Sequence, residues 1–260
     1  MDLQLKGKIV LVTGGAKGIG AAIVRACAEE GAIPVICDKD TDVGKKLQQQ
    51  LLEAGAQSEF FAAELTSAEA CKVAVDGTLE ICGRLDALVN NAGVNDSIGL
   101  ANGTPEEFVA SLQRNLHHFY YMAHYALPAL KRAKGAIVNI SSKTAVTGQG
   151  NTSGYVAAKA AILGLTREWA AELLPDGIRV NAVLPAEVMT PLYQSWLSQF
   201  PSPQEKLSQI QARIPLGKRM TTAEEIASTV VFLLSGKAGH TTGQHLFVDG
   251  GYVHLDRALS

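Results

Sequence analysis

Near its N-terminus the chain reads Thr13-Gly14-Gly15-Ala16-Lys17-Gly18-Ile19-Gly20. A β-branched run, Lys8–Thr13, precedes this stretch, and an amphipathic pattern, Ile19–Glu30, follows it. Glycines allow positive φ angles and a close approach of the backbone to a ligand. The first N–H groups of a following helix lie at the positive end of its dipole. In an arbitrary loop such glycines would indicate only a turn. Between a first strand and a first helix they predict a nucleotide-binding turn.

Strands and helices continue to alternate along the chain. Seven short apolar runs are predicted strands: Lys8–Thr13, Ile33–Asp38, Glu59–Ala62, Ala87–Asn90, Ala136–Ser141, Arg179–Val183 and His245–Val248. Six amphipathic stretches are predicted helices: Ile19–Glu30, Asp42–Ala54, Ser67–Cys82, Pro105–Leu130, Gly154–Leu173 and Ala223–Leu234. Continuously apolar strands with short links to helices indicate right-handed parallel crossovers. We predict one α/β domain over residues 1–260, a Rossmann fold whose doubly wound, seven-stranded parallel sheet has helices on both faces.

One segment, residues 190–216, interrupts this alternation. It contains four prolines and Trp196, one of the two tryptophans. Long excursions inside a compact domain are commonly lids over binding sites. We therefore expect residues 190–216 to form a substrate lid.

The composition excludes several classes of function. The chain has 23 lysines and arginines against 25 aspartates and glutamates, so it lacks the basic excess of a nucleic-acid-binding protein. Its apolar runs are far shorter than the ~20 residues of a membrane-spanning helix, and its first residues do not form a signal peptide. The cysteines and histidines lack the spacing of metal ligands. We expect a cytoplasmic protein with no metal, nucleic-acid or membrane partner.

The second predicted strand ends at Asp38, roughly 20 residues after the glycine turn, where a carboxylate binds the adenosine ribose of a dinucleotide and repels a 2′-phosphate. Asp38 could instead be only an acidic residue near the start of the next helix. Lys17 and Lys39 favour NADP, because a cation near the ribose would attract the phosphate. Since Asp38 itself takes the ribose position, we predict NAD, with NADP as the alternative.

A second group of residues is Ser142, Tyr155 and Lys159. Tyr155 and Lys159 are four residues apart on a predicted helix and share a face, so the ammonium should lower the tyrosine pKa from its usual ~10. Ser142 follows the fifth strand, at the carboxyl edge where open α/β sheets bind ligands. Its hydroxyl can hold a substrate oxygen while Tyr155 moves a proton. Alone, such a Tyr–Lys pair could equally be a snorkelling lysine beside a core tyrosine.

Together these features resemble the short-chain dehydrogenase/reductase family over essentially the whole chain. The stretch Thr13–Gly20 is similar to its cofactor motif, Asn90-Asn91-Ala92-Gly93 to its sheet-stabilising motif, and Asp249-Gly250-Gly251 to the usual end of its last strand. The resemblance implies a nicotinamide dinucleotide as cofactor and hydride transfer to or from an alcohol or carbonyl carbon.

The resemblance also implies roles for single residues. The spacing of Ser142, Tyr155 and Lys159 matches the catalytic residues of the family, and Asn115 matches a fourth, which positions a water in the proton relay from Lys159. Without the resemblance, Asn115 would be an ordinary helix residue. The implied catalytic set is Asn115, Ser142, Tyr155 and Lys159.

Residues Pro185–Thr190 correspond to the loop on the nicotinamide side, where the Val188 backbone and the Thr190 hydroxyl would bind the carboxamide. Two positions depart from the family pattern. Ala186 stands where glycine is usual, and Glu64 stands where an aspartate near the adenine is usual. The implied cofactor-binding set is Gly14, Lys17, Gly18, Ile19, Gly20, Asp38, Glu64, Leu65, Asn91, Ala92, Gly93, Tyr155, Lys159, Pro185, Val188 and Thr190.

The loops beyond the strand ends are polar. Fixed polar groups and one flat aromatic suit a polyhydroxylated ligand, whereas an acyl chain needs an apolar wall. The same residues could instead be solvated loop positions. The candidate substrate-binding residues are Asp96, Lys143, Gln149, Asn151, Glu187 and Trp196.

The segments Pro185–Tyr193 and His254–Leu259 are similar to those of sugar-oxidising members of the family, L-fucose dehydrogenases in particular. This resemblance implies NAD-dependent oxidation of the anomeric carbon of an aldose to a lactone. One alternative is an NADPH-dependent 3-oxoacyl or ketone reductase. A second is a nucleotide-binding regulator without turnover, although such a protein would be expected to have lost a proton-transfer residue.

Family resemblance further implies a homotetramer that packs through the helices Pro105–Leu130 and Gly154–Leu173 and the last strand. The tail after Gly251 could then reach the pocket of a neighbouring subunit.

Overall fold

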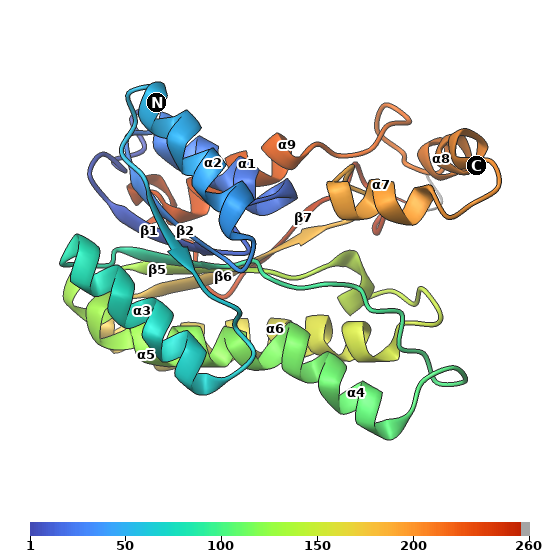
Figure 1. Cartoon of the computed structure of the whole chain (residues 1–260), viewed down its shortest axis with the longest axis horizontal. Coiled ribbons are helices and arrows are strands. Elements are labelled where there is room, and N and C mark those ends of the chain that lie inside the picture. The colour runs from blue at the N-terminus through green and yellow to red at the C-terminus, as the bar shows by residue number, and fades with distance from the viewer. Residues whose placement is uncertain (256–260) are drawn as a thin grey trace.

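A seven-stranded parallel sheet crosses the computed structural model, which describes residues 1–255 (Figure 1). Its strands are β1 (Ile9–Thr13), β2 (Ile33–Asp38), β3 (Glu59–Ala62), β4 (Ala87–Asn90), β5 (Ala136–Ile140), β6 (Arg179–Pro185) and β7 (His245–Val248). They lie in the order β3-β2-β1-β4-β5-β6-β7, and every neighbouring pair is parallel. The order reverses between β1 and β4, and ligands of open α/β sheets bind at the carboxyl side of such a reversal.

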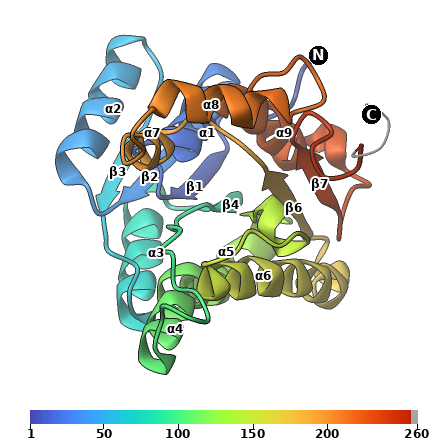
Figure 2. The same ribbon diagram turned by 90° about the vertical axis from the view of Figure 1, so that its right-hand side faces the viewer.

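Helices cover both faces of the sheet, so the predicted doubly wound fold is confirmed (Figures 1 and 2). One face carries α1 (Gly18–Glu29), α2 (Thr41–Glu53) and α9 (Ala223–Leu234). The other carries α3 (Ala68–Cys82), α5 (His118–Ala133) and α6 (Ser153–Glu172), with α4 (Pro105–Leu112) beside α6. Alternate residues of a strand point to opposite faces. Val10 and Val12 of β1 accordingly enter one core cluster, and Ile9 and Leu11 enter the other.

The predicted helix Pro105–Leu130 is interrupted in the structure. A π-helical turn, η1 (Gln113–His117), separates α4 from α5, and α5 continues past Pro128 to Ala133. Asn115 lies in this turn. Single π turns inside helices are frequent at functional sites because they re-aim the side chains they carry.

The segment 190–216 contains two helices that the sequence analysis did not predict, α7 (Pro191–Leu197) and α8 (Pro203–Ala212). Both begin at a proline, where its missing N–H costs no hydrogen bond. The Thr190 hydroxyl caps α7 by accepting from Tyr193 N at 3.2 Å. Both helices lie beyond the carboxyl ends of the strands, on the side of α1 and α2 (Figures 1 and 2).

Two further findings concern residues 1–255 as a whole. None of their helices is long and apolar enough to cross a membrane. They contain no group of three or more histidine, cysteine, aspartate or glutamate side chains that could hold a metal ion. Residues 256–259 of the predicted sugar-dehydrogenase-like ending, and with them most of the tail after Gly251, lie outside the described residues.

Candidate active site

The glycine turn between β1 and α1 contacts the loops that follow β4 and β6. Gly14 and Gly18 have positive φ angles of 61° and 53°. A Cβ on Gly14 would lie 2.9 Å from Ala92 Cα, and one on Gly18 would lie 3.2 Å from Thr190 Cγ2. Any larger residue would therefore push these loops apart. The turn, the β4 loop and the β6 loop meet as the cofactor prediction requires.

The N-terminus of α1 suits a diphosphate. Its N-cap, Lys17, makes no side-chain hydrogen bond to the first turn within residues 1–255, whereas Ser67, Thr104 and Thr222 cap α3, α4 and α9 with their hydroxyls. The first N–H groups of α1 are thus left for a ligand at the positive end of the helix dipole. These features fit a nicotinamide dinucleotide.

The Asn91 side chain braces this turn. Its Nδ2 donates to the carbonyl oxygens of Thr13 and Gly14, both at 3.0 Å, and its backbone N–H donates to the Thr13 hydroxyl at 2.9 Å. Asn90 Nδ2 donates to Asn139 Oδ1 at 3.0 Å and so joins β4 to β5. The side chain of Asn91 therefore shapes the glycine turn from within the protein, which is how it would contribute to a cofactor site.

Asp38 lies at the end of β2 and is also tied to the glycine turn. Its Oδ2 accepts from Ala16 N and its Oδ1 from Asp40 N, both at 3.0 Å. These bonds fix the carboxylate beside the turn, at the place expected for a ribose-binding acid. Ile19 and Leu65, two other predicted cofactor residues, pack partly buried against the two core clusters.

Both lysines that would favour NADP are paired with acids. Lys17 Nζ lies 2.5 Å from Asp40 Oδ2, and Lys39 Nζ lies 3.0 Å from Glu64 Oε1. The hydrogen bond to Lys17 holds the pKa of Asp40 below its usual value, so that acid is ionised. A surface hollow at this end is lined by Lys39, Asp40, Thr41, Asp42 and Glu64. Negative charge dominates there.

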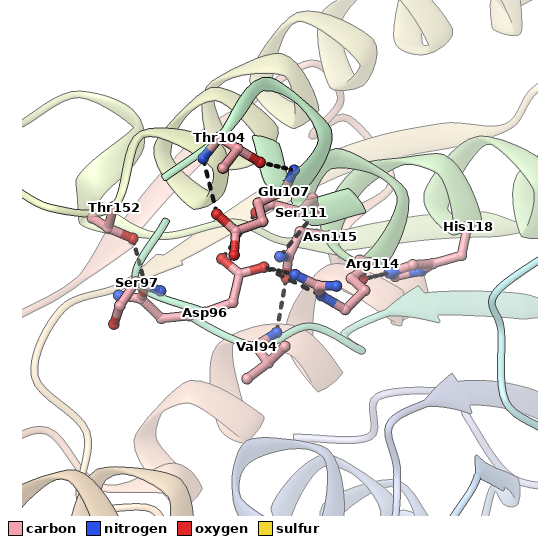
Figure 3. A network of polar contacts seen from close by, with 11 residues as sticks. Val94, Asp96, Ser97, Thr104, Glu107, Ser111, Arg114, Asn115, His118 and Thr152 are labelled. Atoms are coloured by element: carbon pink, nitrogen blue, oxygen red, sulfur yellow. Dashed lines mark hydrogen bonds and ion pairs between the residues drawn. The ribbon is translucent and has the colours of Figure 1, made fainter. Parts of the chain in front are cut away.

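The predicted proton relay converges on Gly93. A Cβ on Gly93 would lie 3.2 Å from Asn115 Oδ1 and 3.4 Å from Lys159 Nζ, so both polar groups reach the same piece of backbone. Asn115 is fully buried, accepts from Val94 N at 2.8 Å and donates to Ser111 O at 3.1 Å (Figure 3). The π turn therefore holds Asn115 beside Lys159, as the resemblance implies.

Ser142, Tyr155 and Lys159 also come together. Lys159 Nζ donates to Ile140 O at 2.8 Å and lies 5.6 Å from the centroid of the Tyr155 ring. Ser142 is buried, and hydrogen bonding from its side chain acts to lower the pKa of Tyr155. The hydroxyl of Thr144 donates to Ser142 Oγ at 3.0 Å and so helps to fix it. A phenol, a hydroxyl and an ammonium thus share one site.

The expected effect of Lys159 on Tyr155 is corrected by the structure. Burial raises the pKa of Tyr155 to about 12, and the hydrogen bond with Ser142 only partly opposes it. Burial also lowers the pKa of Lys159 to about 7. The sequence shows the helical spacing of the pair but not that Lys159 is buried and Tyr155 is partly buried, and loss of solvent disfavours both charged forms. Tyr155 is accordingly a neutral phenol that can donate a proton at neutral pH.

The loop that is predicted to lie on the nicotinamide side follows β6 and approaches the glycine turn at Thr190, next to Gly18. Pro185 and Val188 are buried, and Thr190 N donates to Val188 O at 2.9 Å. The hydroxyl of Thr190 already accepts the capping bond of α7, which leaves its proton to donate elsewhere.

The predicted substrate residues divide into two groups. The carboxylate of Asp96 has partners within the protein: Arg114 Nη2 donates to it at 2.6 Å, as does Ser111 Oγ at 2.9 Å (Figure 3). These donors turn the carboxylate toward α4 and the π turn. Gln149 and Asn151 are exposed loop residues.

Lys143, the residue after Ser142, and Glu187, by contrast, form a largely buried ion pair. Trp196 lies on α7, between the rings of Tyr193 and Phe200 at centroid distances of 5.1 and 4.9 Å. The sequence analysis missed Tyr193 and Thr144. Each acts on a predicted residue, but neither has a spacing that marks it in the sequence.

Known proteins resemble the chain over nearly its full length. Residues 14–253 match the family model adh_short_C2, described as enoyl-(acyl carrier protein) reductase. An L-fucose dehydrogenase of Bos taurus is 37% identical over 252 residues, which are 96% of this chain and 91% of that protein.

Two solved structures are similar as well. The Cj0485 dehydrogenase is 49% identical with a TM-score of 0.94, and the match covers 100% of this chain and 99% of that one. The aldohexose dehydrogenase of Thermoplasma acidophilum is 31% identical with a TM-score of 0.87, over 97% and 96% of the two chains.

Proposed function

The chain belongs to the short-chain dehydrogenase/reductase family, whose members are NAD(P)-dependent oxidoreductases acting on CH–OH groups, and we propose that it uses NAD to oxidise the anomeric carbon of an aldose such as L-fucose to the lactone. The observation that carries the proposal is the convergence on one short loop. Asn91 braces the glycine turn, and two residues later Gly93 meets Asn115 and Lys159. The dinucleotide turn and the proton-transfer residues are therefore neighbours.

In this proposal the chain supplies proton transfer and geometry, and the bound dinucleotide supplies the hydride acceptor. Ser142 donates a hydrogen bond to the substrate oxygen and holds it within reach of Tyr155. Tyr155 takes the hydroxyl proton during oxidation and returns it during reduction. Lys159 holds the ribose next to the nicotinamide. Asn115, in the π turn beside Lys159, positions the water that carries the proton onward. The remaining predicted cofactor residues line the dinucleotide from the glycine turn to Thr190.

The charge at the end of β2 supports NAD over NADP. A 2′-phosphate would face Asp38, and the nearby Lys17 and Lys39 already neutralise Asp40 and Glu64. Fluorescence titration with NADH and NADPH tests this choice. We expect NADH to bind at least ten times more tightly, since each 1.4 kcal/mol of repulsion changes the affinity tenfold. Tighter binding of NADPH would contradict the assignment of Asp38.

Two relatives that act on sugars, the L-fucose dehydrogenase and the aldohexose dehydrogenase, support an aldose as substrate. The test follows NADH formation with L-fucose, D-arabinose and L-galactose and identifies the lactone by mass. Absence of turnover with every aldose would remove the sugar proposal and leave the oxidoreductase assignment intact.

A 3-oxoacyl-[acyl-carrier-protein] reductase of Thermotoga maritima, 32% identical over 252 residues, favours a second candidate, an NADPH-dependent reductase of 3-oxoacyl compounds or ketones. Reduction of a 3-oxoacyl thioester with NADPH, together with no activity on aldoses, would establish that candidate instead.

Closure of a lid over the substrate is also part of the proposed function. We take residues 190–216, with α7 and α8, as the lid that closes over the bound substrate. Leu197 is 5% exposed and anchors α7, whereas Trp196 is 38% exposed and free to change its surroundings when a ligand enters.

A further inference from the structure

The residue after the candidate catalytic serine takes part in a largely buried ion pair. Lys143, the residue after Ser142, contacts the carboxylate of Glu187, and the two side chains are only 11% and 14% exposed. Glu187 also accepts a hydrogen bond from the Tyr193 hydroxyl at 2.6 Å. On the other side, Lys143 Nζ lies 4.0 Å from the centre of the Tyr252 ring.

Such a pair contributes little net stability to the contact between two loops. Burying two charges costs several kcal/mol per ion, and apolar residues of similar size often serve stability equally well or better. The bond from Tyr193 and the face of Tyr252 offset only part of this cost. A buried pair at the edge of a ligand site is therefore better explained by the ligand than by the fold.

The position of the pair connects two parts of the candidate site. Lys143 directly follows Ser142 in the chain, and Ser142 would hold the reacting oxygen of the substrate. Glu187 lies in the Pro185–Thr190 loop, which is expected beside the nicotinamide. In the proposed site, the pair would therefore lie next to the substituents of the reacting carbon. Within residues 1–255, Glu187 is the only side chain that forms a salt bridge with Lys143.

A sugar hydroxyl both donates and accepts hydrogen bonds, and neighbouring hydroxyls need donors and acceptors at adjacent positions. The ammonium of Lys143 supplies donors, and the carboxylate of Glu187 supplies acceptors. We propose that the Lys143–Glu187 pair, held in place by Tyr193 and Tyr252, is the specificity element that binds the hydroxyl next to the reacting anomeric carbon. This inference rests on the proposed function, because it assigns the hydroxyl-reading role within that same site.

The pair also explains how an acyl substrate would be refused. Methylene groups laid over Lys143 and Glu187 would remove water from both charges without replacing its hydrogen bonds. Sites built to bind a hydroxyl reject an analogue that lacks it by large factors, because their polar groups are left without partners. Specificity for polyhydroxylated substrates follows from this penalty.

A comparison of two commercially available sugars tests the proposal. D-arabinose and 2-deoxy-D-ribose differ only in the hydroxyl at C2, next to the anomeric carbon. The ratio of their kcat/KM values measures how strongly the protein reads that hydroxyl. In the wild type we expect D-arabinose to be favoured by about 10²-fold or more. In Glu187→Gln and Lys143→Met the ratio should fall to about 10-fold or less, since one half of the reading pair is gone.

Two further variants distinguish a loss of hydroxyl recognition from a loss of folded protein. Tyr193→Phe removes only the hydroxyl that holds Glu187, so the ratio should fall partway in a fully folded protein. Lys72→Met breaks an exposed pair with Asp76 on α3, and the ratio should stay at the wild-type value. Thermal unfolding and NADH titration establish that each variant is folded.

The outcomes are distinct. An unchanged ratio in Glu187→Gln, Lys143→Met and Tyr193→Phe, with D-arabinose still oxidised, would overturn the specificity role and leave the proposed function standing. If the wild type oxidises neither sugar nor any other aldose, the proposed function fails and takes this inference with it.

Discussion

Lys159 carries an ammonium group into the interior, with 3% of the residue exposed and one hydrogen bond to the Ile140 carbonyl. Burial lowers its pKa to about 7, so the folded protein holds the lysine proton less tightly than the unfolded chain does. The lysine that we propose for the proton relay therefore destabilises the fold. Residues of this kind exchange stability for activity.

Replacing Lys159 should consequently stabilise the protein while removing its activity. The penalty from Lys159 is fully present below a pH of about 7 and fades as the pH rises toward the pKa of 10.5 that an exposed lysine has. We expect Lys159→Met to raise Tm by several degrees at about pH 6 and by little at about pH 10. Differential scanning calorimetry at both pH values measures this. Lys72→Met, which removes an exposed lysine, should show no such gain, and a lower Tm for Lys159→Met at pH 6 would contradict the argument.

Tyr155 should control the rate of turnover. Removing its hydroxyl in Tyr155→Phe leaves the ring in place but takes away the proton donor and acceptor, so kcat/KM should fall by about 10³-fold. NADH binding should persist. In the wild type, oxidation needs the phenolate, and because burial raises the pKa of Tyr155 to about 12, kcat/KM for oxidation should rise with pH across the neutral and alkaline range. Near-normal activity in Tyr155→Phe, or a flat pH profile, would refute its assignment as base.

The π turn between α4 and α5 is the element that aims Asn115 at Lys159. Asp96 fastens this turn to the loop after β4, because its carboxylate accepts from Arg114 on the turn and from Ser111 on α4 (Figure 3). The loop in turn donates Val94 N to Asn115. We therefore expect Asp96 to act on the proposed relay by positioning Asn115.

Loosening this clamp should affect turnover more than binding. Asp96→Asn keeps the size of the side chain but weakens the charge-assisted bonds from Arg114. We expect kcat to fall about tenfold with little change in KM, because the aim of Asn115 is disturbed and the substrate is not touched. Glu107→Gln on α4 is the matched control, since glutamine preserves the capping box with Thr104. A rise in KM for Asp96→Asn without loss of kcat would restore the substrate-contact interpretation.

At the scale of the whole molecule, local sequence patterns predicted the sheet and most of the helices but not the contacts between residues far apart in the sequence. The runs β2, β3, β4 and β7 were predicted at their observed bounds. The central strand β4 and the middle of β2 are buried and consist mainly of apolar residues, as is typical of strands covered on both faces, whereas the edge strands β3 and β7 are only partly buried. The bond from Lys143 to Glu187 joins residues 44 apart in sequence, and no periodicity encodes it. The prolines of residues 190–216 marked an interruption of the strand–helix alternation, and Pro191 and Pro203 begin helices within it. That distinction depends on what precedes each proline and on where the helix can pack.

The direction of the pKa shift of Tyr155 was likewise not predictable from a local pattern. Helical spacing predicted that Lys159 lies near Tyr155, and the structure agrees. The sign of the pKa shift depends on how much protein surrounds both groups, which is a property of the assembled fold and of no single segment.

The outer face of α4, α5 and α6 leads to a prediction about assembly. Val109 and Tyr120 are 58% and 51% exposed there, and the Tyr120 ring stacks on His124 at 5.9 Å and lies 6.4 Å from Trp169 on α6. Apolar and aromatic surface of this kind favours association. We expect a homotetramer that uses this face, as family resemblance implies.

A charge in the middle of this face should prevent that association. In Tyr120→Glu, assembly would have to bury a carboxylate between subunits, which is unfavourable without a partner of opposite charge. Every subunit carries the same substitution, so the neighbouring subunit adds no positive charge. We expect the wild type to elute as a tetramer in size-exclusion chromatography with light scattering, and Tyr120→Glu as a smaller species with a lower Tm, because assembly stabilises the folded state by mass action. Val73→Glu places the same charge on α3, where Val73 is 50% exposed outside the proposed face, and should remain tetrameric. If Tyr120→Glu stays tetrameric while Val73→Glu dissociates, the subunits pack through α3 instead.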